Sequence, residues 1–216
     1  MKKVLFLTVC MLFLVAGWAQ ADSLSLGGNY SKYVYSKVDG NDRTDGAGSI
    51  DPSSLNGHAL KYVYCADLFV DVPVPASYAY TAVNKLGQIY DSPLPNAGKV
   101  AWLLDQYGMA GQGDTQLALQ AAIWHEILIG AGHSFALTAT NSQSVIGQYN
   151  DMLTALGTNN TATVSDFFWI TPGAKDSNGH VVAYQGLVAP VPIPGALWLL
   201  GSGLVGLVGI RRRVKK

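Results

Sequence analysis

The stretch "LQAAIW", residues 119–124, is typical of a buried helix, but its apolar run is interrupted by Gln120. Residues at spacings of three and four share one face of a helix, and here that face holds Leu117, Gln120, Trp124 and Ile127. A primary amide buried without a partner costs about 1–3 kcal/mol. We therefore expect Gln120 to be either hydrogen-bonded to the protein interior or altered chemically.

The first 21 residues predict a secretory signal peptide. Two lysines follow the initial methionine, an apolar run extends to about residue 17, and Ala19 and Ala21 place a cleavage site before Asp22. The apolar run is short and ends in small residues, which favours a cleaved signal over a retained membrane helix. We predict that the protein is exported.

Residues 22–188 are predicted to form one domain, long enough to bury a core. The chain contains 14 acidic and 14 basic side chains, but half of the basic ones lie in the terminal segments outside this domain. Because all the acidic residues lie inside it, the domain carries an excess of negative charge. This charge makes nucleic acid an unsuitable partner.

Cys65 is the one cysteine of the exported chain, because Cys10 leaves with the signal peptide. An intrachain disulfide is impossible, and a lone thiol outside the cell is usually oxidised or paired. The alternation of residues 59–70 predicts a strand, with Asp67 on the same face as Cys65. The alternative is an unreactive thiol with a purely structural role in the core, but we interpret Cys65 as a residue with a chemical role.

The remaining patterns predict an α+β domain. Strands are expected at 31–38, 162–172 and 180–188, with "DGND" as a turn after the first. Helices are expected to end at Gly108 and at Gly157, and the second carries a stripe of Val145, Tyr149, Met152 and Leu156. The helix containing Gln120 is expected to begin at Asp114 or Thr115, either of which could cap it, and to end near Leu128.

Two motifs resemble those of the thioester domains of bacterial surface adhesins. Tyr64-Cys65 matches an aromatic residue followed by cysteine, and "LQAAIW" matches an apolar residue, Gln, two variable residues, an apolar residue and Trp. The resemblance implies a β-sheet or barrel core with a packed helical part, and an internal thioester that joins Cys65 to Gln120 with loss of ammonia. It also implies that Tyr64 and Trp124 shield this bond from water.

The carboxy-terminal segment, residues 189–216, predicts a second sorting signal. An apolar helix over 194–210 would cover about 25 Å, enough to span a bilayer core, and basic residues follow it. This ending resembles the PEP-CTERM signals that exosortases process in Gram-negative bacteria, in their Val-Pro-Leu-Pro-Ala variant. The matching residues here are Pro192, Ile193, Pro194, Arg211, Arg212 and Arg213. A simple membrane anchor is the alternative.

The sequence offers other candidate catalytic and metal-binding arrangements. His125 lies about 140° around the helix from Gln120, yet it or His133 could act as a general base. A Cys-His-Asp nucleophile would combine Cys65 and His125 with Asp151 or Asp166. The loop "DGNDRTDG", residues 39–46, offers oxygen ligands at Asp39, Asn41, Asp42 and Asp45, but Arg43 interrupts the pattern, so we predict a solvated turn. We predict no metal and no cofactor.

The sequence is thus interpreted as that of an exported surface or matrix protein, held in the inner membrane until its tail is processed. A lysine amine of a surface or matrix macromolecule would attack the Gln120 carbonyl, Cys65 would leave, and Asp67 could accept the ammonium proton. The binding is single-turnover, so the protein is not an enzyme in this interpretation. The alternative is a non-covalent structural protein in which Cys65 and Gln120 are core residues.

Overall fold

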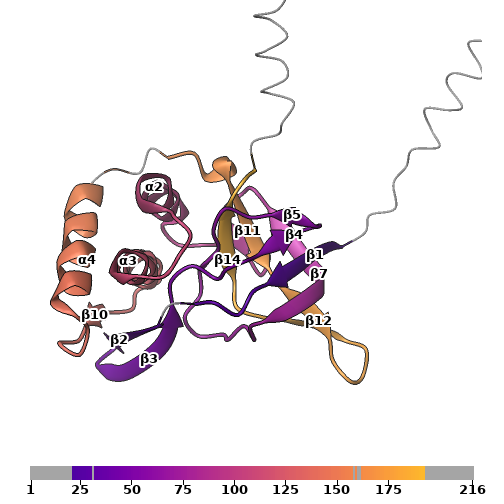
Figure 1. The fold of residues 1–216 in the computed structure, drawn as a ribbon, viewed down its shortest axis with the longest axis horizontal. Helices are drawn as coiled ribbons and strands as arrows, with labels where there is room; N and C mark the ends of the chain where they lie inside the picture. Colours follow the sequence, from indigo (N-terminus) through magenta and orange to yellow (C-terminus); the bar gives the residue numbers. More distant parts are fainter. Residues whose placement is uncertain (1–20, 31, 158, 160–161, 193–216) are drawn as a thin grey trace, which may run out of the picture.

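The computed structural model describes residues 21–30, 32–157, 159 and 162–192. Within this part the chain is α+β: a curled, antiparallel, half-closed sheet packs beside a group of three helices. Figure 1 shows the helices gathered on one side of the sheet. The predicted α+β class is confirmed.

The main sheet contains seven of the described strands, and every pairing in it is antiparallel. Their order across the sheet is β5-β4-β1-β7-β11-β14-β6. The bounds are β1 Asp22–Leu26, β4 Ser54–Leu55, β5 His58–Ala59, β6 Tyr64–Cys65, β7 Ala76–Asn84, β11 Phe167–Thr171 and β14 Leu187–Pro190. β6, which carries Cys65, is therefore the strand at one edge of this sheet.

A smaller sheet has the order β10-β2-β3 and lies against the helices, with bounds β2 Lys32–Val38, β3 Asn41–Ala47 and β10 Phe135–Leu137. Asp39 and Gly40 connect β2 to β3, and both have positive φ, of 50° and 80°, as a tight hairpin turn requires. The predicted strand at 31–38 and the turn after it are confirmed. Two short hairpins complete the strands: β8 Gln88–Ile89 with β9 Ser92–Pro93, and β12 Gly173–Lys175 with β13 Val181–Ala183.

The described helices are α2 Ala97–Tyr107, α3 Asp114–Gly130, α4 Gln143–Leu156 and the 3₁₀ turn η1 Val164–Asp166. α3 packs against α2, α4, β2, β3 and β10, so every residue from 116 to 124 is buried (Figure 1). The predicted face of α3 is buried, and burial extends beyond this face to all residues from 116 to 124. A helix enclosed by two helices and a sheet has no solvent side.

The helix ends agree with the predictions for α2 and α4 but not for the N-cap of α3. α2 ends at Gly108 and α4 at Gly157, as predicted, and the stripe of α4 is buried. α3 starts at Asp114 and ends at Gly130, but its N-cap is Gly113, which gives no side-chain cap. The prediction that Asp114 or Thr115 caps the helix is wrong.

Three predicted strands differ from the observed ones. The strand expected at 59–70 is reduced to β5 and β6, because residues 62–66 are all buried and do not alternate. In the segment 162–172 the strand starts only at Phe167, after η1. The segment 180–188 forms two strands, β13 and β14, and β14 extends to Pro190, two residues beyond the predicted domain end.

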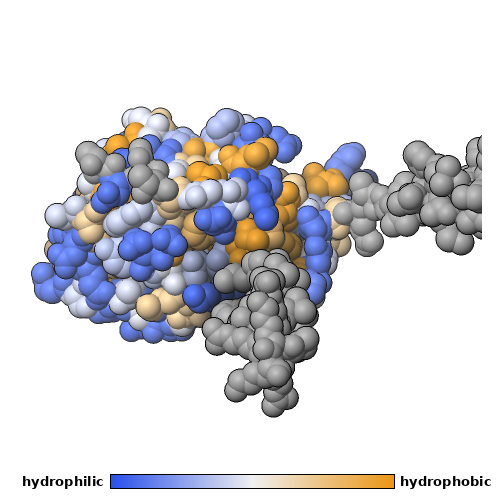
Figure 2. Space-filling model, turned by 90° about the horizontal axis from the view of Figure 1, so that it is seen from above, coloured by the Kyte–Doolittle hydropathy of each residue, from blue (hydrophilic) through white to orange (hydrophobic). Residues whose placement is uncertain are grey.

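The surface differs between the two ends of the molecule. Figure 2 shows mostly hydrophilic side chains over the helical end and hydrophobic ones gathered towards the sheet. Among the described helices, none combines the length and the apolar character needed to cross a bilayer. Residues 1–20 and 193–216, which include the predicted membrane helix at 194–210, lie outside the described residues.

Candidate functional site around Cys65

Cys65 is fixed at the edge of the main sheet by its backbone. It pairs with Leu187 of β14, and the next amide, of Ala66, donates to the Gly186 carbonyl at 2.7 Å. The side chain is 5% exposed and is a free thiol. The chain leaves the strand directly after Cys65, so the sulfur lies where the sheet ends.

Gln120 contacts the backbone of Cys65 from the opposite side. The Cys65 amide donates to Gln120 Oε1 at 3.0 Å, and Gln120 Nε2 donates to the Cys65 carbonyl at 2.7 Å. Gln120 is fully buried, and both polar atoms of its side chain are satisfied by one residue that lies 55 positions away in sequence. Cys65 and Gln120, predicted from separate motifs, are thus direct neighbours in space.

The sulfur itself contacts a second glutamine. Cys65 Sγ donates to Gln185 Oε1 at 3.2 Å, and Gln185 Nε2 donates to the Asp67 carbonyl. Gln185 lies in the link between β13 and β14, inside the segment 180–188 for which one continuous strand was predicted. Sequence reasoning missed this residue, although a glutamine in the largely apolar run "VVAYQGLV" was a signal.

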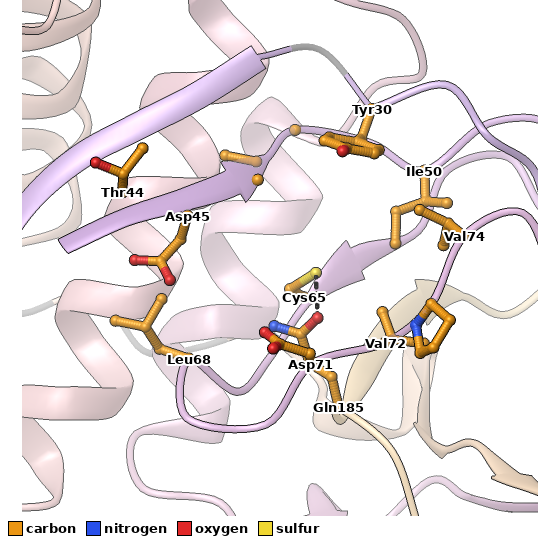
Figure 3. A pocket seen from close by; sticks show the side chains of 14 residues that line it. Tyr30, Thr44, Asp45, Ile50, Cys65, Leu68, Asp71, Val72, Val74 and Gln185 are labelled. Atoms are coloured by element: carbon orange, nitrogen blue, oxygen red, sulfur yellow. Dashed lines mark hydrogen bonds between the residues drawn. The ribbon is translucent and has the colours of Figure 1, made fainter.

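A pocket of about 350 Å³ leads from the surface to Cys65 and Gln185. Figure 3 shows its walls: Tyr30, Ile50, Val72 and Val74 on one side, and Thr44, Asp45 and Asp71 on the other. The pocket joins residues from the start of the chain, from the β2–β3 hairpin and from the segment after β6. A group from outside therefore has a route to the sulfur.

Burial dominates the electrostatics of the thiol. It raises the pKa of Cys65 to about 12, and the nearby carboxylates of Asp67, Asp45 and Asp71 add to the shift. Both causes disfavour the thiolate, so the sulfur is protonated at neutral pH. This is the opposite of an activated catalytic cysteine, whose pKa is lowered.

Tyr64 and Trp124 enclose the site from the interior. Tyr64 is fully buried, its hydroxyl donates to the Met109 carbonyl at 2.8 Å, and its ring packs edge-on against Tyr62. Trp124, one turn after Gln120 on α3, is 1% exposed. Burial raises the pKa of the Tyr64 hydroxyl well above its usual range, so this side chain is neutral. Both aromatic residues are buried close to Cys65 or Gln120 in the chain, so their burial is consistent with the predicted dry surroundings.

Asp67 is placed differently from the prediction. β6 ends at Cys65, so strand alternation does not extend to Asp67. Its carboxylate accepts from the Phe69 amide at 2.8 Å and from the Tyr90 hydroxyl at 2.8 Å. It lines a separate pocket together with Trp124, so the expectation that Asp67 shares a face with Cys65 is wrong.

His125 belongs to another cluster. Its Nδ1 is 2.7 Å from the Tyr149 hydroxyl, and its ring packs against Phe135 on the side of α3 that faces α4 and β10. Asp151 is an exposed residue of α4, and Asp166 lies in η1 beside Pro190. The structure therefore does not bring together the Cys-His-Asp arrangement considered for Cys65.

The carboxylates of the loop at 39–46 are held by neighbouring side chains rather than turned together. His133 pairs with Asp39 at 2.7 Å, Lys37 with Asp42 and Arg43 with Asp45. Among the described residues no group of three possible metal ligands is found. Of the predicted sorting motif, only Pro192 is described; Ile193, Pro194, Arg211, Arg212 and Arg213 lie outside.

Comparisons with protein families, with curated proteins and with solved structures find no match to this chain. The similarity to thioester domains therefore rests on the two short motifs. To these the structure adds the contact between Cys65 and Gln120.

Proposed function

We propose that this protein is an exported binding protein with the core of a thioester domain, which attaches covalently to its partner through a bond between Cys65 and Gln120. The observation that carries the proposal is the paired hydrogen bonding between the Gln120 carboxamide and the Cys65 backbone in a buried site. The side chain of Gln120 is thus anchored to the main chain of a residue 55 positions away, beside a pocket that reaches the sulfur of that residue.

In the proposed reaction the bond forms within this contact. Cys65 Sγ attacks Cδ of Gln120, the C–N bond breaks, and the thiol proton leaves with the amide nitrogen as ammonia. The Cys65 amide, which donates to Gln120 Oε1 at 3.0 Å, stabilises the negative charge that develops on this oxygen. The other contact, from Nε2 to the Cys65 carbonyl, orients the leaving group.

The surroundings preserve the bond until a partner arrives. A thioester hydrolyses in water, and the full burial of Gln120, Tyr64 and Trp124 keeps water from its carbonyl. Capture then occurs when an amine, such as a lysine side chain, attacks the carbonyl of residue 120. A new amide forms, the C–S bond breaks, and the amine proton passes to the sulfur.

The terminal segments give the proposed location. Residues 1–21 direct export, and the tail that begins at residue 189 holds the protein in the inner membrane until an exosortase-type protease processes it. The protein then acts at the cell surface or in the extracellular matrix. The partner is an amine-bearing macromolecule there, and an acidic domain favours a lysine-rich one.

The intact mass of freshly purified protein tests the proposal. It is expected to fall short of the sequence mass by one ammonia, and Cys65 is expected to resist alkylation in denaturant unless methylamine has first opened the bond; denaturant is needed because burial protects the free thiol as well. Cys65→Ser and Gln120→Ala are expected to have their full sequence masses. Gln116→Ala is the matched control, because Gln116 is a buried glutamine of the same helix that bonds only to the Ala110 carbonyl.

The non-covalent alternative also has an observation in its favour. The amide of Gln120 is fully hydrogen-bonded, as that of an ordinary core glutamine would be. A full sequence mass in fresh protein, with Cys65 alkylated in denaturant without any methylamine treatment, would refute the thioester and favour this alternative.

A further inference from the structure

Cys65 lies between two glutamines that hold different parts of it. Gln120 bonds only to the main chain of Cys65, whereas Gln185 accepts from the sulfur at 3.2 Å. Figure 3 shows this contact at the floor of the pocket. Gln185 is 9% exposed and lines the same pocket as the thiol. The role of the second glutamine is not explained by bond formation.

The carboxamide of Gln185 has a fixed orientation. Its Nε2 donates to the Asp67 carbonyl, and its backbone amide donates to the Asp71 carbonyl at 3.3 Å. The next amide, of Gly186, donates to the Tyr90 hydroxyl at 3.0 Å, and that hydroxyl donates to Asp67 Oδ2 at 2.8 Å. A flip of the amide would set two acceptors against each other, so Oε1 is the atom presented to the sulfur.

The free thiol and the amide at residue 120 correspond chemically to the state after capture. In that state the partner's nitrogen takes the place of Gln120 Nε2, and Cys65 has regained its proton. Burial raises the pKa of Cys65 to about 12, so the released sulfur stays protonated and can donate. The sulfur of a thioester has no proton, so the bond to Gln185 is absent while the thioester is closed and can form again once it opens.

We propose that Gln185 is a positioning residue that holds the Cys65 thiol after the thioester opens and thereby makes capture one-way; this rests on the thioester proposed above. In capture the amine nitrogen bonds to Cδ of residue 120, the C–S bond breaks, and the amine proton moves to Sγ. The new S–H then donates to Gln185 Oε1. Re-closure requires the thiol to leave this acceptor, which slows the reverse reaction.

Re-closure after methylamine treatment measures this effect. The full chain is opened with methylamine, free amine is removed, and intact mass follows the loss of methylamine as the thioester returns. Gln185→Leu keeps the side-chain size but removes the acceptor, so it is expected to re-close about five to ten times faster than the wild type. Tyr90→Phe, which retains Gln185 but loosens its anchor, is expected to change in the same direction by less.

The controls separate this proposal from the thioester itself. Gln116→Leu, a substitution of a buried glutamine outside the site, is expected to re-close at the wild-type rate. If the wild type shows no ammonia deficit, the thioester proposal fails, and this one fails with it. If the deficit is present but Gln185→Leu re-closes no faster, or never forms the bond, the thioester stands and the role of Gln185 is refuted.

A spectroscopic measurement does not depend on rates. With Cys10→Ser in the full chain, Cys65 is the one remaining thiol, so the Raman S–H band that appears on opening belongs to it. A hydrogen-bonded S–H group absorbs at lower frequency than a free one. The band of Gln185→Leu is expected to lie above that of the parent protein, and an unchanged band would refute the contact.

Discussion

The two sides of helix α3 carry polar residues in different kinds of surroundings. On the side facing β6, Gln120 contacts the backbone of Cys65, beside a pocket that reaches the sulfur. On the side facing α4, His125 contacts the Tyr149 hydroxyl and packs against Phe135. His125 is the more reactive residue type, but its hydrogen bond serves packing between helices. A buried polar side chain therefore points to a functional site only when its hydrogen-bond partner also has a part in the proposed reaction.

The largest difference between the two sides is expected in covalent capture. Incubation of the wild type with lysine-bearing surface or matrix material is expected to give a conjugate that survives boiling in detergent and reductant, because the new link is an amide. Cys65→Ala and Gln120→Ala each remove the activated carbonyl and are expected to abolish the band on a denaturing gel. His125→Phe is expected to retain it. A conjugate formed equally by Cys65→Ala would disprove the thioester mechanism.

A large difference is also expected in stability. The link between Cys65 and Gln120 closes a loop of 55 residues, which stabilises the folded state by roughly 4 kcal/mol in the chain-entropy model. Each single alanine variant is expected to lose about this free energy of unfolding, and the double variant hardly more, because either change removes the whole cross-link. Denaturant unfolding of the three variants measures this.

The side that faces α4 gives the matched comparison for stability. His125→Phe and Tyr149→Phe each remove one hydrogen bond, for an expected loss of about 1 kcal/mol. If losses at Cys65 and Gln120 are additive and of this same size, then the two sides of α3 are equivalent and no cross-link exists.

Acid is expected to destabilise the protein mainly through His125, on the side of α3 that faces α4. Burial lowers the pKa of His125 below its ordinary value of 6.5. As the pH falls through 6.5 the unfolded chain binds a proton that the folded chain resists, so the free energy of unfolding decreases. Thermal melts between pH 7 and pH 5 are expected to show a smaller loss for His125→Phe than for the wild type. The other titratable groups are common to both proteins, so an equal loss would contradict the assignment to His125.

The smallest effect, on the rate of thioester opening, is expected for a substitution of Asp67, two residues after Cys65. Its carboxylate is held by the Phe69 amide and the Tyr90 hydroxyl and does not line the pocket of Cys65. Loss of a general base costs roughly 100-fold or more in rate, whereas Asp67→Asn is expected to leave the rate of methylamine opening nearly unchanged. A 100-fold slower opening in a mass-spectrometric time course would restore Asp67 as the proton acceptor.

Local patterns in the sequence determined the described α-helices and the β2 strand with its turn. The stripe of α4 with Gly157 after it, the end of α2 at Gly108, and the β2–β3 turn were predictable, because a helix stop or a tight turn depends on a few neighbouring residues. The two short motifs also indicated Cys65 and Gln120, since an unpaired cysteine in a chain with a predicted export signal and a glutamine in an apolar helix are each unusual.

Only the tertiary structure decided the surroundings of Cys65. Gln185 lies 120 positions from it and reaches the sulfur because β14 pairs with β6. Asp67 turns away because the strand ends at Cys65. The complete burial of α3 also arises from its neighbours. Sequence periodicity reports which face of one element is apolar, whereas the order of strands in a sheet and the packing of helices against it depend on contacts between distant segments.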